Sequence, residues 1–140
     1  MKTTKFFMAA ALSCFLIFSG AAAQAYPDMV GTWKATNEAV VIGNPKHYKT
    51  SPDTATPRFV GADLTVTIRQ QEGRRLAGTV ATADYSEAFL GVLWRDGKSL
   101  RGVDENGFIE ARISDPNTME WCYTHTGATM VAGCMVLTRR

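Results

Sequence analysis

The sequence predicts an all-β fold, an eight-stranded antiparallel up-and-down β-barrel with one cross-strand disulfide. Short runs rich in Val, Ile, Thr and aromatic residues recur from Gly31 onward, and turn signals separate them roughly every dozen residues. No stretch shows a sustained helical spacing of apolar residues. Eight strands joined by short turns would leave two open edges, and closure into a barrel removes both.

Residues 1–25 are predicted to be a secretory signal peptide. Lys2 and Lys5 precede an apolar run over residues 6–18, and residues 23–25 (Ala-Gln-Ala) place small side chains around a cleavage site. The apolar run is shorter than the roughly 20 residues needed to cross a bilayer, and no second run follows it. We therefore expect a secreted or periplasmic protein with no membrane span and a single domain over residues 26–140.

The charge balance of the mature chain bears on whether it binds nucleic acid. Both leader lysines count among the 15 basic residues, whereas none of the 13 acidic residues precedes Asp28, so the mature chain is neutral. Nothing in this balance of charge predicts binding to nucleic acid.

Cys122 and Cys134 remain once the leader with Cys14 is removed. In an oxidising compartment two cysteines suffice for one disulfide, and two buried free thiols are the alternative.

The expected strands follow from the turn signals. Glu72-Gly73, Asp96-Gly97 and Asn106-Gly107 are typical of tight hairpin turns, and residues 115–118 (Asp-Pro-Asn-Thr) fit a type I turn, so consecutive strands pair as antiparallel neighbours. The strands are expected over residues 30–42, 60–71, 75–83, 88–95, 98–104, 108–114, 119–126 and 129–139.

The turns also predict which residues face one another. If Asp96-Gly97 and Asn106-Gly107 are two-residue loops, Leu93 faces Leu100 and Leu100 faces Ile113. The same register makes an inward row of small residues, which predicts an internal cavity; glycines that merely let the strands coil are the alternative. The row consists of Gly78, Gly91, Gly102 and Ala111.

The two cysteines fit the same scheme. They lie symmetrically about Ala128, so a hairpin centred there places Cys122 directly opposite Cys134 on the outward face. Such a bridge would be structural, because the two cysteines lack the Cys-x-x-Cys spacing of redox centres.

Three features together resemble the calycin superfamily of lipocalins, fatty-acid-binding proteins and avidins. They are Gly31-Thr32-Trp33 in the first strand, the proline-rich loop over residues 43–58, and Arg139 near the end of the last strand. The resemblance implies a closed end at Gly31 and Trp33 with Arg139 packed on the Trp33 ring, a long loop at the open end, and small-ligand binding. The chain is closer in length to an avidin, but no biotin-binding set is recognised, and no second lipocalin motif.

Because consecutive strands run in opposite directions, a set of polar residues is expected at the open end of the barrel. A small number of polar groups on otherwise apolar walls is typical of a ligand pocket. The candidate ligand-binding residues are Asn37, His47, Tyr48, Tyr85, Asp104, Tyr123 and His125, with Asp84, Glu87 and Glu105 on the same rim. Simpler roles stay open: Asp104 could cap its own turn, Asn37 and Tyr123 could bond each other, and the 43–58 loop could be either a lid or disordered.

These residues favour an exported barrel that binds a small, largely apolar ligand at its open end, without a cofactor or metal. An alternative is an interaction module or inhibitor that acts through the 43–58 loop or an outward apolar stripe of Leu90, Val92, Trp94 and Val103, which would also suit a homo-oligomer. An enzyme centred on His125 and Asp104 is a third hypothesis. No recognisable catalytic motif accompanies that pair, so we do not expect an enzyme.

Overall fold

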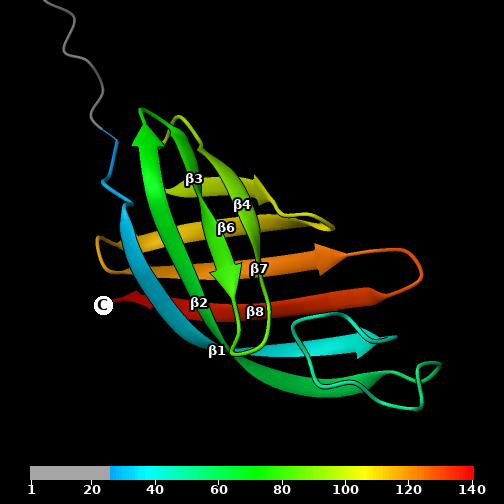
Figure 1. Cartoon of the computed structure of the whole chain (residues 1–140). Helices are drawn as coiled ribbons and strands as arrows, with labels where there is room; N and C mark the ends of the chain where they lie inside the picture. Colours follow the sequence, from blue (N-terminus) through cyan, green and yellow to red (C-terminus); the bar gives the residue numbers. More distant parts are fainter. Residues whose placement is uncertain (1–25) are drawn as a thin grey trace, which may run out of the picture.

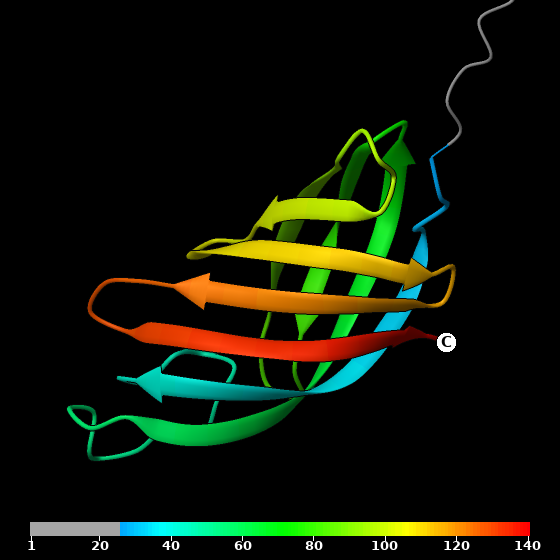
Figure 2. The ribbon, with the colours of Figure 1, turned by 180° about the vertical axis from the view of Figure 1, so that it is seen from behind.

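The computed structural model describes residues 26–140, which form a closed barrel in which each strand pairs antiparallel with the next and β8 pairs with β1 (Figures 1 and 2). The predicted signal peptide lies outside the described residues. All eight predicted strands are present, within two residues of their expected bounds. They are β1 Gly31–Ile42, β2 Arg58–Glu72, β3 Arg75–Ala81, β4 Ser86–Leu93, β5 Ser99–Val103, β6 Gly107–Asp115, β7 Thr118–His125 and β8 Met130–Arg139.

Alternation of buried and exposed residues determines which face of each strand is inside. In β4 every second residue, from Glu87 through Phe89 to Leu93, is buried, and the residues between them are exposed. The long β2 strand adds a register shift between Ile68 and Gln70. Beside it, a Cβ on Gly78 would lie 1.9 Å from a backbone oxygen of β2, so glycine is needed where the two backbones approach.

The predicted pairing is confirmed on one side of β5 and wrong on the other. Leu93 pairs with Leu100 as expected. Leu100, however, pairs with Ala111 and not with Ile113. The β5–β6 turn is centred one residue earlier than Asn106-Gly107 requires, which moves the partner of Leu100 by two residues. A shift of two residues keeps the same face inward, so the predicted inward set survives the error.

Asp104 causes this difference in register. Its Oδ1 accepts the backbone N–H of Asn106 at 3.0 Å and of Gly107 at 2.8 Å, which fixes Glu105 and Asn106 as the two turn residues. Gly107 has no positive φ and belongs to β6. The β2–β3 turn also differs by one position, since Glu72 pairs with residue 75 and leaves residues 73 and 74 as its loop.

The predicted cavity at the row of small residues is absent, because the Phe89 ring fills it. A Cβ on Gly91 would lie 2.7 Å from that ring and one on Gly102 only 2.6 Å from it. The ring also packs against Trp121, with 5.1 Å between the ring centroids. The glycines therefore make room for an aromatic side chain, and this part of the interior is a packed core.

The closed end is built around Trp33, which is fully buried. Its Nε1 donates a hydrogen bond to the carbonyl of Met29 at 3.1 Å, and the Arg139 guanidinium lies 4.6 Å from the ring centroid. The contact that the calycin resemblance implied is thus present. Gln71 holds the preceding segment across this end, since it accepts the N–H of Met29 and donates to the carbonyl of Pro27.

The disulfide is confirmed. Cys122 and Cys134 are register partners in β7 and β8, with 4.1 Å between their Cα atoms, and the hairpin is centred on Ala128 as predicted. In the chain-entropy model, closing a ring of this size stabilises the fold by about 3 kcal/mol.

Candidate functional site

The loop between β1 and β2 forms a lid over the open end of the barrel, on the same side as the β7–β8 turn (Figure 1). It is held by its own hydrogen bonds: the N–H of Gly43 donates to the carbonyl of Thr54 at 3.0 Å, and Asn44 and Ser51 bond each other twice. Arg58 donates to the carbonyl of Gly43 at 2.6 Å. Of the two structures considered for this loop, the folded lid is the one observed.

Three consecutive residues, Lys46, His47 and Tyr48, reach from the lid to the barrel, and we call them the lid tip. Tyr48 is buried, and its hydroxyl accepts a hydrogen bond from Asn37 Nδ2 at 2.5 Å. Burial raises the pKa of Tyr48 to about 12, although the Asn37 bond acts to lower it. The lid tip therefore places a neutral phenol inside the barrel.

Asn37 itself is 1% exposed, and its Oδ1 has no hydrogen-bond partner within the described part of the chain. Gly133 lies beneath it, where a Cβ would stand 3.0 Å from that oxygen. A buried amide oxygen without a donor carries a free-energy cost that a ligand or a water molecule can remove.

The second lid-tip contact joins His47 to Glu87. His47 Nε2 lies 2.6 Å from Glu87 Oε1, and the Glu87 side chain is almost fully buried. Burial raises the pKa of Glu87, the His47 bond acts against this, and the charge of Asp104 adds to it. The other ring nitrogen of His47, Nδ1, is buried with no partner among residues 26–140.

The imidazole–carboxylate pair at this end is thus His47 with Glu87, whereas the sequence suggested His125 with Asp104. Asp104 instead caps its own turn and accepts a hydrogen bond from the Tyr123 hydroxyl at 3.3 Å. Burial, together with the Asp104 carboxylate, raises the pKa of Tyr123. Asn37 and Tyr123 do not satisfy each other, since Asn37 bonds to Tyr48.

The third lid-tip contact is made by Lys46. Its Nζ donates to the Tyr85 hydroxyl at 3.0 Å, lies 4.8 Å from the Tyr85 ring centroid, and is 3.7 Å from Glu105 Oε2. The Lys46 bond acts to lower the pKa of Tyr85, but desolvation and the charges of Glu87 and Glu105 raise it overall. The same bond to Tyr85 raises the pKa of Lys46.

Two hollows lie around these contacts. A mouth pocket of about 170 Å³ lies at the rim, and a smaller cavity of about 20 Å³, enough for roughly one water molecule, lies deeper. His47, Tyr48 and Tyr123 line both. The structure brings all seven predicted residues to one hollow or the other: Asn37 and Asp104 to the deeper one, Tyr85 and His125 to the mouth.

Lys46 and Glu87 are the important residues that the candidate set omitted. Glu87 was placed on the rim, between two strands, although it lies two residues before Phe89 and so shares the inward face of β4. If the predicted strand had begun two residues earlier, the alternation of inward and outward residues would have identified Glu87 as an inward residue. No pattern in the sequence indicated a role for Lys46, because its contacts depend on how the lid folds.

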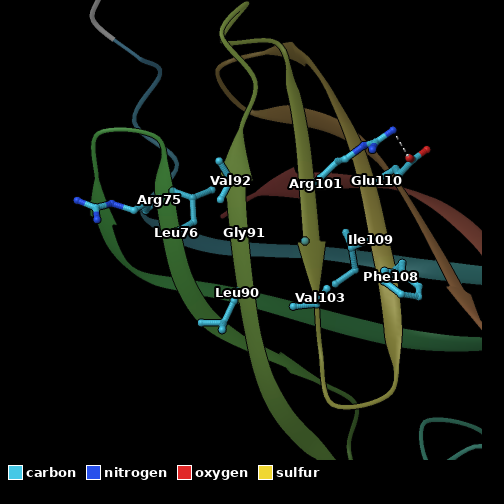
Figure 3. Close-up of a pocket in the computed structure, with 11 residues that line it drawn as sticks. Arg75, Leu76, Leu90, Gly91, Val92, Arg101, Val103, Phe108, Ile109 and Glu110 are labelled. Atoms are coloured by element: carbon cyan, nitrogen blue, oxygen red, sulfur yellow. Dashed lines mark ion pairs between the residues drawn. The ribbon is translucent and has the colours of Figure 1, made fainter.

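A separate groove of about 600 Å³ runs over the outer face of β3 to β6 (Figure 3). Leu90, Val92, Val103 and Phe108 line it, and Arg101 and Glu110 form an ion pair of 3.2 Å at its side. The predicted apolar stripe is therefore exposed as expected, and Trp94 beyond it is 51% exposed.

The apolar surface also continues around the barrel. On the outer face, one residue from each strand pairs with one residue of the next strand, and together these residues form a row around the barrel. None of the side chains in this row is charged. The row consists of Ala77, Leu90, Val103, Phe108, Thr124, Ala132, Val40 and Phe59. Val40, Phe59 and Ala132 line a second outer hollow.

No protein-family model and no curated protein matches this chain. Among solved structures, it is similar to the S-type phycobiliprotein lyase CPES from Guillardia theta, with a TM-score of 0.34 and 11% sequence identity over 80% of this chain and 88% of that one. Nothing about a ligand or an activity follows from a likeness of this degree.

Two kinds of feature are absent from residues 26–140. No group of three or more His, Cys, Asp or Glu side chains is arranged to hold a metal ion. The described residues also contain no helix with the length and apolar character that crossing a membrane requires.

Proposed function

We propose that this protein is an exported, calycin-like barrel that binds a small, largely apolar ligand beneath the lid. The observation that carries the proposal is a pair of buried polar atoms, Asn37 Oδ1 and His47 Nδ1, which have no partner in the described structure and border the same cavity. Buried polar atoms are nearly always paired, so unpaired ones beside a hollow favour a missing ligand or water.

The walls below the lid tip suit an apolar ligand body. The deeper cavity is lined by five apolar side chains, and Tyr48 of the lid covers them. A movement of Tyr48 away from the barrel would join the mouth pocket to this apolar wall. The lid tip contacts the barrel through side chains, so such a movement would break no strand pairing. The wall consists of Leu64, Val80, Ile109, Trp121 and Met135.

Export is supported by the predicted signal peptide and by the disulfide between Cys122 and Cys134, which is typical of oxidising compartments. The same two features support a secreted or periplasmic location. Membership of the calycin superfamily is supported by the closed eight-stranded barrel together with the Trp33–Arg139 contact.

A native mass spectrum of the protein purified from its own host tests the proposal. We expect a non-covalent adduct that disappears under denaturing conditions and that Asn37→Leu weakens, because the substitution removes the acceptor. Phe59→Ala is the matched control, since Phe59 is 89% exposed on the outer face. An adduct-free spectrum, together with no binding of small apolar probes, would rule the proposal out.

A second candidate function, self-association, is favoured by the outer groove. Phe108 is 65% exposed and lines the groove together with Leu90 and Val103, so two copies related by a two-fold axis could pack these apolar side chains against each other. Sedimentation velocity is the test. A concentration-dependent dimer that Phe108→Ser abolishes would support it, and a monomer at every concentration would refute it.

A further inference from the structure

The mouth of the barrel is crowded with hydrogen-bond acceptors. The Tyr85 hydroxyl alone lies 3.5 Å from Glu87 Oε2 and 3.2 Å from Glu105 Oε2, so these two carboxylates flank one phenol. Asp104 adds a third, bonded to Tyr123 at the wall that the mouth and the deeper cavity share. Like charges held this close favour a cation between them.

One of the buried atoms that border this hollow without a partner is an acceptor as well. Asn37 Oδ1 accepts and cannot donate. The second such atom, His47 Nδ1, is also buried beside the hollow, on the ring whose Nε2 lies 2.6 Å from Glu87 Oε1. Asn37 Oδ1 therefore lacks a donor, and a ligand that supplies N–H groups complements it.

In the closed structure, the lid supplies its own basic groups to this end. Lys46 places its ammonium over the Tyr85 ring and beside Glu105, and His47 places its imidazole on Glu87. Of the side chains that line the mouth pocket in the described part of the chain, Lys46 is the only lysine or arginine. A movement of the lid tip would uncover an aromatic ring and two carboxylates together.

We propose that the polar end of the ligand is a primary ammonium group, which replaces Lys46 and His47 at Tyr85, Glu87 and Glu105 when the lid opens. This inference rests on the proposed function and adds the chemical class of the ligand, a small alkyl or aryl amine. The ammonium donates to Glu87, the most buried of these carboxylates, and lies against the Tyr85 ring, where a cation is attracted by the π face. The apolar body extends toward Ile109 and Trp121.

Isothermal titration calorimetry with three probes of one chain length, hexylammonium, hexan-1-ol and hexanoate, tests this class at neutral pH and low salt. We expect hexylammonium to bind at least tenfold more tightly than hexan-1-ol, and hexanoate to bind more weakly than either. Added salt should weaken only the binding of hexylammonium, since ion pairing is screened.

Variants separate the contacts. Glu87→Gln and the exposed Glu105→Gln should each weaken hexylammonium binding by about tenfold and leave hexan-1-ol unchanged, with circular dichroism to verify the fold. Lys46→Met should strengthen hexylammonium binding severalfold, because it removes the competing internal cation. Glu110→Gln, which removes a carboxylate from the outer face, is the control and should change neither.

The outcomes distinguish this inference from the function on which it rests. If hexan-1-ol or hexanoate binds as tightly as hexylammonium, or if Lys46→Met and both Glu variants leave hexylammonium binding unchanged, the ammonium assignment is wrong and the small-ligand function stands. If no probe binds and the native mass spectrum shows no adduct, both are wrong.

Discussion

The two ends of the barrel are closed in different ways. At the closed end, the polar contacts of Trp33 and Gln71 go to backbone groups of the segment that leads into β1. At the lid end, Lys46, His47 and Tyr48 are held by side chains, and five of the six groups in these contacts can gain or lose a proton. The contacts of Trp33 and Gln71 at the closed end are therefore made by groups that do not titrate, whereas most of the lid-tip contacts are made by groups whose charge depends on pH.

This difference assigns separate roles to the ends. The closed end is packed around the buried Trp33, and farther along the interior the Phe89 ring leaves no cavity at Gly91 and Gly102. The lid end keeps two hollows. Three buried atoms there, Asn37 Oδ1, His47 Nδ1 and Arg58 Nε, have no partner in the described structure, compared with one at the closed end, Arg139 Nε, and each lowers stability. Residues with such uncompensated costs are more often functional than structural.

The largest expected effect is at the closed end. Trp33→Ala removes a fully buried aromatic side chain, so we expect the free energy of unfolding to fall by about 3–5 kcal/mol. Urea unfolding followed by circular dichroism measures it. Ligand binding by the folded fraction should be unchanged, and a loss of binding in a well-folded variant would show that the two ends are coupled.

Gly102→Ala tests whether the barrel interior is solid. The added Cβ would lie 2.6 Å from the Phe89 ring and 2.8 Å from a backbone oxygen, and overpacking of this kind costs about 1–3 kcal/mol. The double variant Phe89→Leu/Gly102→Ala should be less destabilised than the sum of its two single variants. A fully stable Gly102→Ala protein would indicate spare room at this level of the barrel.

Tyr48→Phe removes the acceptor of Asn37 Nδ2 and leaves that buried donor unpaired, at a cost of about 1–3 kcal/mol. Alkaline titration sharpens the test. Because the pKa of Tyr48 in the fold is about 12, above its ordinary value of 10, its contribution to stability is complete below pH 10 and is lost as the pH rises through 12. Near-ultraviolet absorbance should show one fewer late-ionising phenol in the variant, and an unchanged titration would contradict the buried position of Tyr48.

The smallest effect is a pH dependence at Glu87. Its pKa is raised, chiefly by burial, so the stability that it contributes is complete below its ordinary value of 4.5 and is lost as the pH rises through the raised pKa. Relative to Glu87→Gln, the wild-type protein should therefore lose stability as the pH rises above 4.5. Urea midpoints measured across that range for both proteins decide it, and parallel curves would contradict the assignment.

Much of the fold could be predicted because turns and alternation are local signals. Asp96-Gly97 and the symmetric placement of Cys122 and Cys134 determined two registers correctly. The β5–β6 register was wrong because the side chain of Asp104 captures two backbone N–H groups, and this moves the turn. The dipeptide pattern alone does not distinguish these two turns.

The candidate site was predictable as a location but not as a set of contacts. Strand direction alone sends Asn37, Tyr123 and His125 toward one end. Which imidazole meets which carboxylate depends on the path of a proline-rich loop that no periodicity describes, so the pairing of His47 with Glu87 was missed.

By itself, the sequence determined the strand number, the antiparallel order, the disulfide and the end of the barrel at which polar groups gather, because each follows from local alternation, turn chemistry and chain direction. Only the tertiary structure decided what fills the interior and what the lid touches. Those outcomes depend on contacts between residues far apart in the chain, such as Phe89 over Gly102 and Tyr48 against Asn37, which local patterns do not encode.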